Sequence, residues 1–114
     1  MVRLLKFLSQ ASYDDEYSRT RIICGRHYRF QSEQRSNGVV EYLIIDSDRM
    51  YNLYRERLRN LGETAVYTGS DEMYHALKNS SLTVDAFSDV ELGPRCIKID
   101  PALMLQEDIR QFKR

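Results

Sequence analysis

The fold is decided by residues 20–45, whose sequence is TRIICGRHYRFQSEQRSNGVVEYLII. Residues 20–30 and 39–45 are rich in the β-branched and aromatic side chains that favour strands. Asn37-Gly38 lies between these two runs and accepts the positive φ angles that a tight hairpin turn requires. The segment therefore predicts an antiparallel β-hairpin.

The first strand of this hairpin is expected to separate apolar from basic side chains, because successive strand residues point to opposite faces. One face carries Ile22, Cys24, Tyr28 and Phe30, and the other carries Arg19, Arg21, His27 and Arg29. Arginine makes planar two-point contacts with carboxylates and phosphates, so the second set predicts a contact surface. The alternative is the solvated face of an edge strand, where charge blocks unwanted pairing.

The second strand of the hairpin is apolar on both sides. One face carries Val39, Leu43 and Ile45, and the other carries Val40, Tyr42 and Ile44. A strand that is apolar on both faces is expected to be buried on both. One face would meet the helices of this domain, and we hypothesise that the other meets a second copy of the chain in a homodimer.

The rest of the chain alternates helical and extended patterns. We expect a helix at 48–61, a strand at 63–68, a helix at 71–79, strands at 82–87 and 95–99, and a last helix from Asp100-Pro101 onward. Residues 2–10 fit either a helix or an edge strand. The sequence thus predicts one α+β domain over residues 1–114, in the order β-β-α-β-α-β-β-α, with a mixed, mostly antiparallel sheet of about five strands and about three helices.

The charge balance argues against a general polyanion-binding protein. The 114 residues include 17 Lys and Arg and 17 Asp and Glu, which gives a formal net charge of zero. Nucleic-acid-binding domains usually carry a basic excess. Eight tyrosines accompany the arginines, and this pair of residue types is enriched where proteins contact one another.

We therefore interpret the chain as a small, non-enzymatic binding or regulatory protein whose partner is another protein. The predicted contact residues are Arg19, Arg21, His27 and Arg29 on the hairpin, with Arg55 and Arg59 on the first long helix. No run approaches the ~20 apolar residues that span a bilayer, and the first residues make a poor secretion signal. A cytoplasmic location without membrane contact is the expectation.

Two other functions use the same hairpin. Tyr28 and Phe30 beside Arg26, Arg29 and Arg35 suggest a surface that stacks bases and binds phosphates of RNA or DNA. A metal-independent ribonuclease would combine the base His27 with Arg21, Arg29 and Glu41. Both aromatic side chains should point away from Arg29 on a regular strand, which weakens the nucleic-acid reading.

Metal and cofactor chemistry find little support in the sequence. Cys24-x-x-His27 has a ligand-like spacing, but residues three apart on a strand point to opposite faces. Asp46 and Asp48 could hold Mg²⁺, but capping of the following helix explains them without a metal and is the favoured interpretation. Cys24 and Cys96 are interpreted as free thiols of a reducing compartment. We expect no cofactor and no bound metal.

Overall fold

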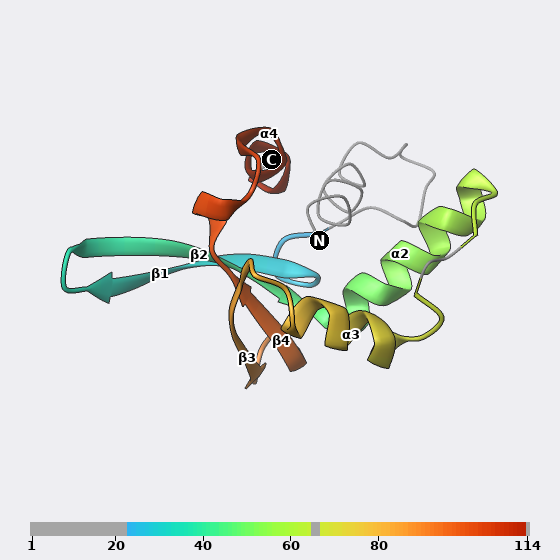
Figure 1. Cartoon of the computed structure of the whole chain (residues 1–114), viewed down its shortest axis with the longest axis horizontal. Helices are drawn as coiled ribbons and strands as arrows, with labels where there is room; N and C mark the ends of the chain where they lie inside the picture. Colours follow the sequence, from blue (N-terminus) through green and yellow to red (C-terminus); the bar gives the residue numbers. More distant parts are fainter. Residues whose placement is uncertain (1–22, 65–66, 114) are drawn as a thin grey trace.

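The computed structural model describes residues 23–64 and 67–113 (Figure 1). In chain order its elements are β1 (Tyr28–Arg35), β2 (Gly38–Asp46), α2 (Ser47–Leu61), α3 (Ser70–Lys78), β3 (Thr83–Asp89), β4 (Gly93–Ile99), the 3-10 helix η2 (Pro101–Leu103) and α4 (Gln106–Phe112). The strands form an antiparallel sheet in the order β1-β2-β4-β3. The predicted α+β class is confirmed, and the described residues form one compact domain.

The hairpin turn lies where the sequence places it. The antiparallel register of β1 and β2 pairs Arg35 with Gly38, which leaves Ser36 and Asn37 as a two-residue loop. Gly38 has a φ of 120°, a conformation that glycine adopts without the steric cost of a Cβ. The Asn-Gly signal therefore predicted the hairpin, although β1 continues to Arg35 instead of ending at Phe30.

The predicted start of the first strand is wrong for the described residues. β1 begins at Tyr28, and residues 23–27 fold back on themselves instead of extending. Gly25 has a φ of 88°, its N–H donates to the Tyr28 carbonyl at 2.7 Å, and His27 N–H donates to the Ile23 carbonyl at 2.9 Å. The reversal at Gly25 ends the extended chain that the apolar pattern suggested, and residues 20–22 lie outside the described part.

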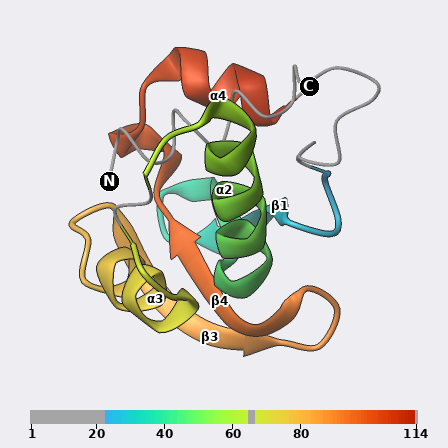
Figure 2. The ribbon, with the colours of Figure 1, turned by 90° about the vertical axis from the view of Figure 1, so that its right-hand side faces the viewer.

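The core lies between one face of the sheet and the helices α2, α3 and α4, with α2 in front of the sheet in Figure 2. The sheet contributes Tyr28, Leu43, Ile45, Ile97 and Ile99 to this core, and the helices contribute Met50, Tyr51, Leu53, Tyr54, Leu58, Met73, Leu77 and Phe112. Tyr28 on β1 donates its hydroxyl hydrogen to the Phe112 carbonyl, which fastens the end of α4 to the first strand. The predicted inward direction of Tyr28 and Phe30 is confirmed.

The capping signals predicted at Gly62 and Asp100 are confirmed, whereas the N-terminal ends of α2 and α3 have no side-chain capping hydrogen bond. Gly62 adopts the left-handed conformation at φ 69° and ends α2 as expected. The Asp100 carboxylate accepts the Ala102 N–H at 3.0 Å, so Asp100 also caps as expected. The segment after it is not one helix, however, because η2 ends at Leu103 and α4 begins at Gln106.

The strand predicted at 63–68 is absent from the described part of that segment. Glu63, Thr64, Tyr67 and Thr68 have no strand partner, and the Tyr67 ring packs on Tyr54 of α2 at a centroid distance of 5.7 Å. Strand propensity there gives way to packing against a helix. The described sheet therefore has four strands instead of about five, and every pairing in it is antiparallel.

The second face of β2 is covered near its base by the chain itself. Ile44 is fully enclosed, and it clusters with Leu92, Cys96 and the partly buried Phe87. The homodimer hypothesis assumed that a second copy of the chain covers this face, but at Ile44 residues of the same chain cover it. Dimerisation itself stays a prediction.

Glycine 93 is required by a close approach at the same place. A Cβ built on Gly93 would lie 2.7 Å from the Asp46 carboxyl carbon, which is shorter than any normal contact. The Asp46 side chain is only 2% exposed, so it has little room to move away.

The sheet has two parts that differ in how they are supported. β4 pairs with β2 only from Leu43 to Asp46, so residues 38–42 of β2 pair with β1 alone. We call residues 31–42 the arm, and the remaining described residues the body. The arm projects from the body as a two-stranded ribbon (Figure 1), and along β2 the exposure rises from 0% at Leu43 to 66% at Val39.

Candidate functional site

The six predicted contact residues do not form one surface among the described residues. Arg19 and Arg21 lie outside the described part. His27 lies in the turn before β1 and is buried, whereas Arg29 lies on β1. The face that sequence alternation assigned to these residues depended on an extended chain through Gly25, which the structure does not have. Their role in binding stays a prediction.

Arg29 is engaged in a two-point ion pair. Its Nη1 and Nη2 donate to the Asp89 carboxylate on β3 at 2.5 and 2.7 Å, and Nη2 also donates to Gln31 Oε1 at 2.8 Å. The Arg29 guanidinium lowers the pKa of Asp89 to about 2, with help from the Leu92 N–H. This pair crosses the open face of the sheet, which is the face that points away from the helices.

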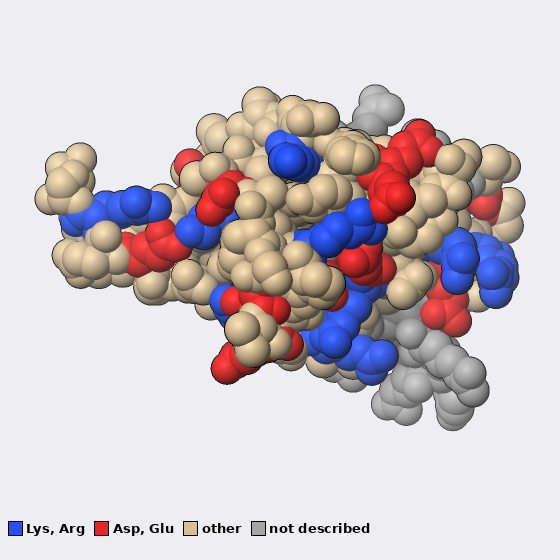
Figure 3. Space-filling view, turned by 90° about the horizontal axis from the view of Figure 1, so that it is seen from below, with Lys and Arg blue, Asp and Glu red and all other residues tan. Residues whose placement is uncertain are grey.

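The other charges of the open face also bind one another. Glu33 on β1 accepts from Lys98 on β4, from Arg35 at 2.8 Å and from Gln31 at 3.2 Å. The Tyr42 ring lies 5.6 Å from the Arg35 guanidinium and 5.2 Å from the Lys98 ammonium. Basic and acidic atoms lie next to each other along the projection at the left of Figure 3. The face is therefore nearly neutral and largely satisfied within the chain.

This arrangement gives little support to the nucleic-acid alternative. Tyr28 and Phe30 pack toward the core, where their rings meet edge to face at 6.2 Å. Tyr42 lies on the open face but is only 8% exposed. Binding of single-stranded nucleic acid without base readout uses accessible rings together with unpaired cations, and the rings of Tyr28, Phe30 and Tyr42 are not accessible in this way.

The ribonuclease alternative also lacks its geometry. Glu41 faces Ser32 in the arm, and its carboxylate pairs with Lys113 at 2.5 Å. His27 precedes the base of the hairpin, so about five residues of strand separate the two side chains, which corresponds to ~17 Å. General base and acid do not converge on one bond from these positions.

Arg55 and Arg59 are exposed on α2, as a contact role requires. Arg55 lies over the Tyr51 ring at 5.8 Å. Arg59 lies in the last turn of the helix, where a positive charge is favourable. Because α2 covers the core face of the sheet, these two residues do not share a surface with Arg29.

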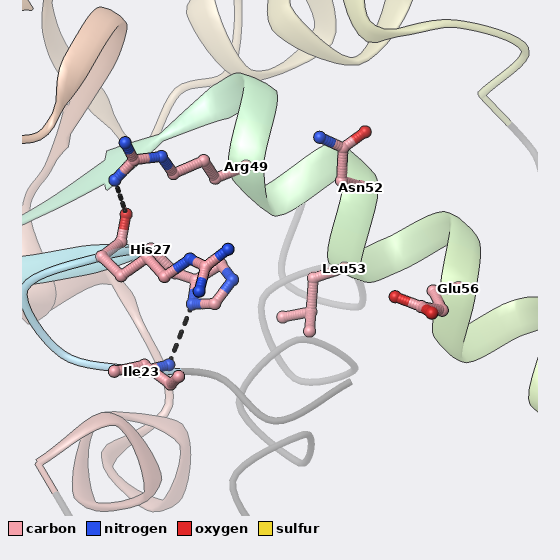
Figure 4. Close-up of a pocket in the computed structure, with 7 residues that line it drawn as sticks. Ile23, His27, Arg49, Asn52, Leu53 and Glu56 are labelled. Carbon is pink, nitrogen blue, oxygen red and sulfur yellow. Dashed lines mark hydrogen bonds between the residues drawn. The ribbon is translucent and has the colours of Figure 1, made fainter. Parts of the chain in front are cut away.

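A small pocket lies between the turn before β1 and helix α2 (Figure 4). Its volume is about 160 Å³, and its lining consists of Ile23, Arg26, His27, Arg49, Asn52, Leu53 and Glu56. Arg49 donates from Nη1 to the Arg26 carbonyl at 3.0 Å, and its Nε lies 3.4 Å from Asp46 Oδ2. The spacing of Arg49, Asn52 and Glu56 on one helix face was visible in the sequence, but the meeting with His27 depends on the turn.

His27 is the buried member of this pocket. Its Nδ1 accepts the Ile23 N–H at 3.0 Å, and its own carbonyl accepts the Asp46 N–H at 2.9 Å. Burial lowers the pKa of His27 to about 4, and the charges of Arg26 and Arg49 act in the same direction. The imidazole is therefore neutral at physiological pH.

The sequence analysis did not identify Arg95 as important, although this residue connects β4, α2 and α3. From β4 it donates to Asp48 of α2 and to Asp71 of α3, each with a contact of 2.5 Å, and it lies 4.8 Å from the Tyr74 ring centroid. Asp48 is therefore held by an arginine. Nothing local in the sequence links Arg95 to carboxylates 47 and 24 residues away.

The cysteines and acidic residues add no metal site in the described ranges. Cys24 is exposed and Cys96 is buried, and neither forms a disulfide. Burial raises the pKa of Cys96 to about 11, so this thiol stays protonated. Among residues 23–64 and 67–113, no group of three or more His, Cys, Asp or Glu side chains is placed to hold a metal ion.

Comparison with known proteins identifies no relative of this chain, so the function has to be inferred from the fold and the contacts. No protein-family model, curated protein or solved structure matches this chain. Within the described part of the chain, no helix has both the length and the apolar character needed to cross a lipid bilayer.

Proposed function

We propose that the chain is a non-enzymatic binding protein that contacts another protein through the outer edge of strand β1. The observation that carries this proposal is the exposed backbone of the arm. β1 is the first strand of the sheet and pairs regularly with β2 over all eight of its residues. Such an edge can accept an extended segment of a partner as an additional strand.

The hydrogen-bond pattern identifies which backbone groups face this edge. Asp46 N–H donates to the His27 carbonyl, which marks the two as a bonded pair. Bonded and non-bonded pairs alternate along an antiparallel ladder, so the even-numbered residues of β1 direct their N–H and C=O groups outward. The Tyr28 carbonyl already accepts from Gly25. Outward backbone groups remain at Phe30, Ser32 and Gln34.

The opposite edge of the sheet is less suitable for strand addition. The pairing of β3 with β4 has register shifts between Thr83 and Asp85 and between Phe87 and Asp89. Irregularities of this kind bend an edge strand and protect it from pairing. The contrast favours β1 over β3 as the contact edge.

Proline at an outward position tests the proposal. Ser32→Pro and Gln34→Pro each remove one outward N–H without breaking the β1–β2 ladder, and proline is tolerated at such edge positions. We expect partners captured from the native cell by the unaltered chain to be lost with both proline variants. Ser32→Ala is the matched control, because it removes the same side chain and keeps the outward backbone N–H.

Three further experimental outcomes would decide between the β1 edge, a homodimer and the nucleic-acid alternative. Equal capture by the unaltered chain and both proline variants would reject the β1 edge as the contact. A dimer mass in light scattering that Ser32→Pro abolishes would identify the partner strand as a second copy of this chain. Micromolar RNA or DNA binding that weakens steeply with salt would favour the nucleic-acid alternative instead.

A further inference from the structure

We propose that the pocket between the turn before β1 and helix α2 binds a small oxyanion, a phosphate or carboxylate group. The inference rests on the side chains that line this pocket and is independent of the β1 edge. The pocket lies beside the buried His27 and below the first turns of α2 (Figure 4). Its volume of about 160 Å³ is well above the ~10–15 Å³ that a single water requires, so a phosphate or carboxylate group fits.

His27 provides a fixed neutral donor. Because Nδ1 accepts the Ile23 N–H, the proton of the neutral ring lies on Nε2. Figure 4 shows the other ring nitrogen on the side of the ring that faces Leu53 and α2. The turn at Gly25 holds the ring in place through the His27 N–H bond to Ile23, so the donor is oriented before any ligand arrives.

Two guanidinium groups flank this donor. Arg26 is exposed, and its guanidinium has no hydrogen-bond or ion-pair partner among the described residues. Arg49 uses Nη1 for the Arg26 carbonyl and Nε for Asp46, and its Nη2 has no partner within the described chain. Arginine nitrogens of this kind form two-point, charge-assisted bonds with oxyanions.

The negative charges near the pocket do not neutralise the two arginines at its donor-rich end. Glu56 lies seven residues beyond Arg49 on α2, which corresponds to ~10 Å along the helix axis. The Asp46 carboxylate lies on the Nε side of Arg49, at 3.4 Å. Arg26, His27 and Arg49 therefore make one end of the pocket rich in donors, and Glu56 marks the other end.

The experiment follows the His27 ring by NMR during titration with inorganic phosphate and, separately, with acetate. Ionic strength is held constant with sodium chloride. We expect a saturable shift of the His27 ring resonances and a rise in the pKa of His27, because a bound anion favours the imidazolium. Saturation by phosphate alone or by acetate alone supports the site and identifies which oxyanion it takes.

Variants separate specific binding from general charge attraction. Arg26→Gln should weaken the affinity about tenfold, which corresponds to ~1.4 kcal/mol, because it removes a charge-assisted hydrogen bond to the oxyanion. Arg110→Gln removes the same charge from the exposed surface of α4 and should leave the affinity unchanged. Arg26 is exposed, so its substitution does not threaten folding. No saturable shift with either anion, or equal affinity in Arg26→Gln, would overturn the proposal.

Discussion

The body and the arm of this protein are parts of the same sheet, yet they are held by different interactions. In the body, Leu43 and Ile45 are enclosed by helices, and in the arm four residues away Val39 is two-thirds exposed. The arm is held instead by a polar chain from Arg35 through Glu33 on β1 to Lys98 on β4, which links the first strand to β4 across β2. A two-stranded ribbon without a packed face is marginally stable alone.

The difference shows where this molecule can vary without losing its fold. Apolar burial supplies the stability of the body, and it depends on volume and shape. Ion pairs near water contribute little energy, but they restrict the conformations of the strands that carry them. The arm can therefore be ordered enough to offer an edge while its side chains stay replaceable.

The largest expected effect compares two residues on one face of β2. Leu43→Ala should lower the free energy of unfolding by about 2–5 kcal/mol, because it leaves a cavity in a closed core. Val39→Ala, four residues away in the arm, should change it by less than about 0.5 kcal/mol. Urea unfolding followed by circular dichroism measures both. Similar losses at the two positions would remove the distinction between body and arm.

The pH dependence of the body is expected to come from His27. Its pKa is about 4 in the folded chain, below the ordinary value of ~6.5 that applies after unfolding. The unfolded chain therefore binds a proton first, and stability is lost as pH falls from 6.5 through 4, by about 1–3 kcal/mol. His27→Gln should flatten this part of the unfolding free-energy profile. His75→Gln, an exposed control on α3, should leave the profile unchanged.

Arg95 provides an intermediate case, because it is an ion-pair residue in the body. Arg95→Met should cost about 1–2 kcal/mol of unfolding free energy, since Asp48, Asp71 and the Tyr74 ring lose a shared partner. Arg59→Met, at the exposed end of α2, should cost less than about 0.5 kcal/mol. Thermal unfolding resolves the two. Equal costs would mean that Arg95 adds nothing beyond solvated charge.

The smallest effect is expected in the arm. Glu33→Gln removes the carboxylate that binds Lys98 and Arg35, and it should leave the unfolding midpoint almost unchanged. Amide hydrogen exchange in residues 31–42 should become severalfold faster, because the strands of the arm separate more often. Glu91→Gln in the β3–β4 loop is the control. Unchanged exchange in the arm would show that the polar chain does not order it.

The parts of the fold that the sequence predicted depend on residues close together in the chain. Asn37-Gly38 encodes its turn by backbone conformation, and Gly62 ends α2 for the same reason. The same reasoning missed Gly25, because the β-branched residues before it suggested a continuous strand. One positive φ there displaced His27 from the predicted basic face into a buried turn.

The candidate sites depend on contacts between distant residues, so periodicity could not reveal them. Arg29 meets Asp89 sixty residues away, and this pair decides that Arg29 is engaged within the chain. The pocket requires α2 to lie against the turn that contains His27, which only the packing of the domain fixes. The strand direction of Arg29 was predicted correctly, but its partner was not.

The contact between Gly93 and the Asp46 carboxyl has an evolutionary consequence. Any side chain at position 93 would overlap a group that is itself enclosed. In descendants of this gene the two positions should be inherited as a pair, with a larger residue at 93 tolerated only where 46 has become smaller. Covariation between them would be a signature by which distant homologues could be recognised.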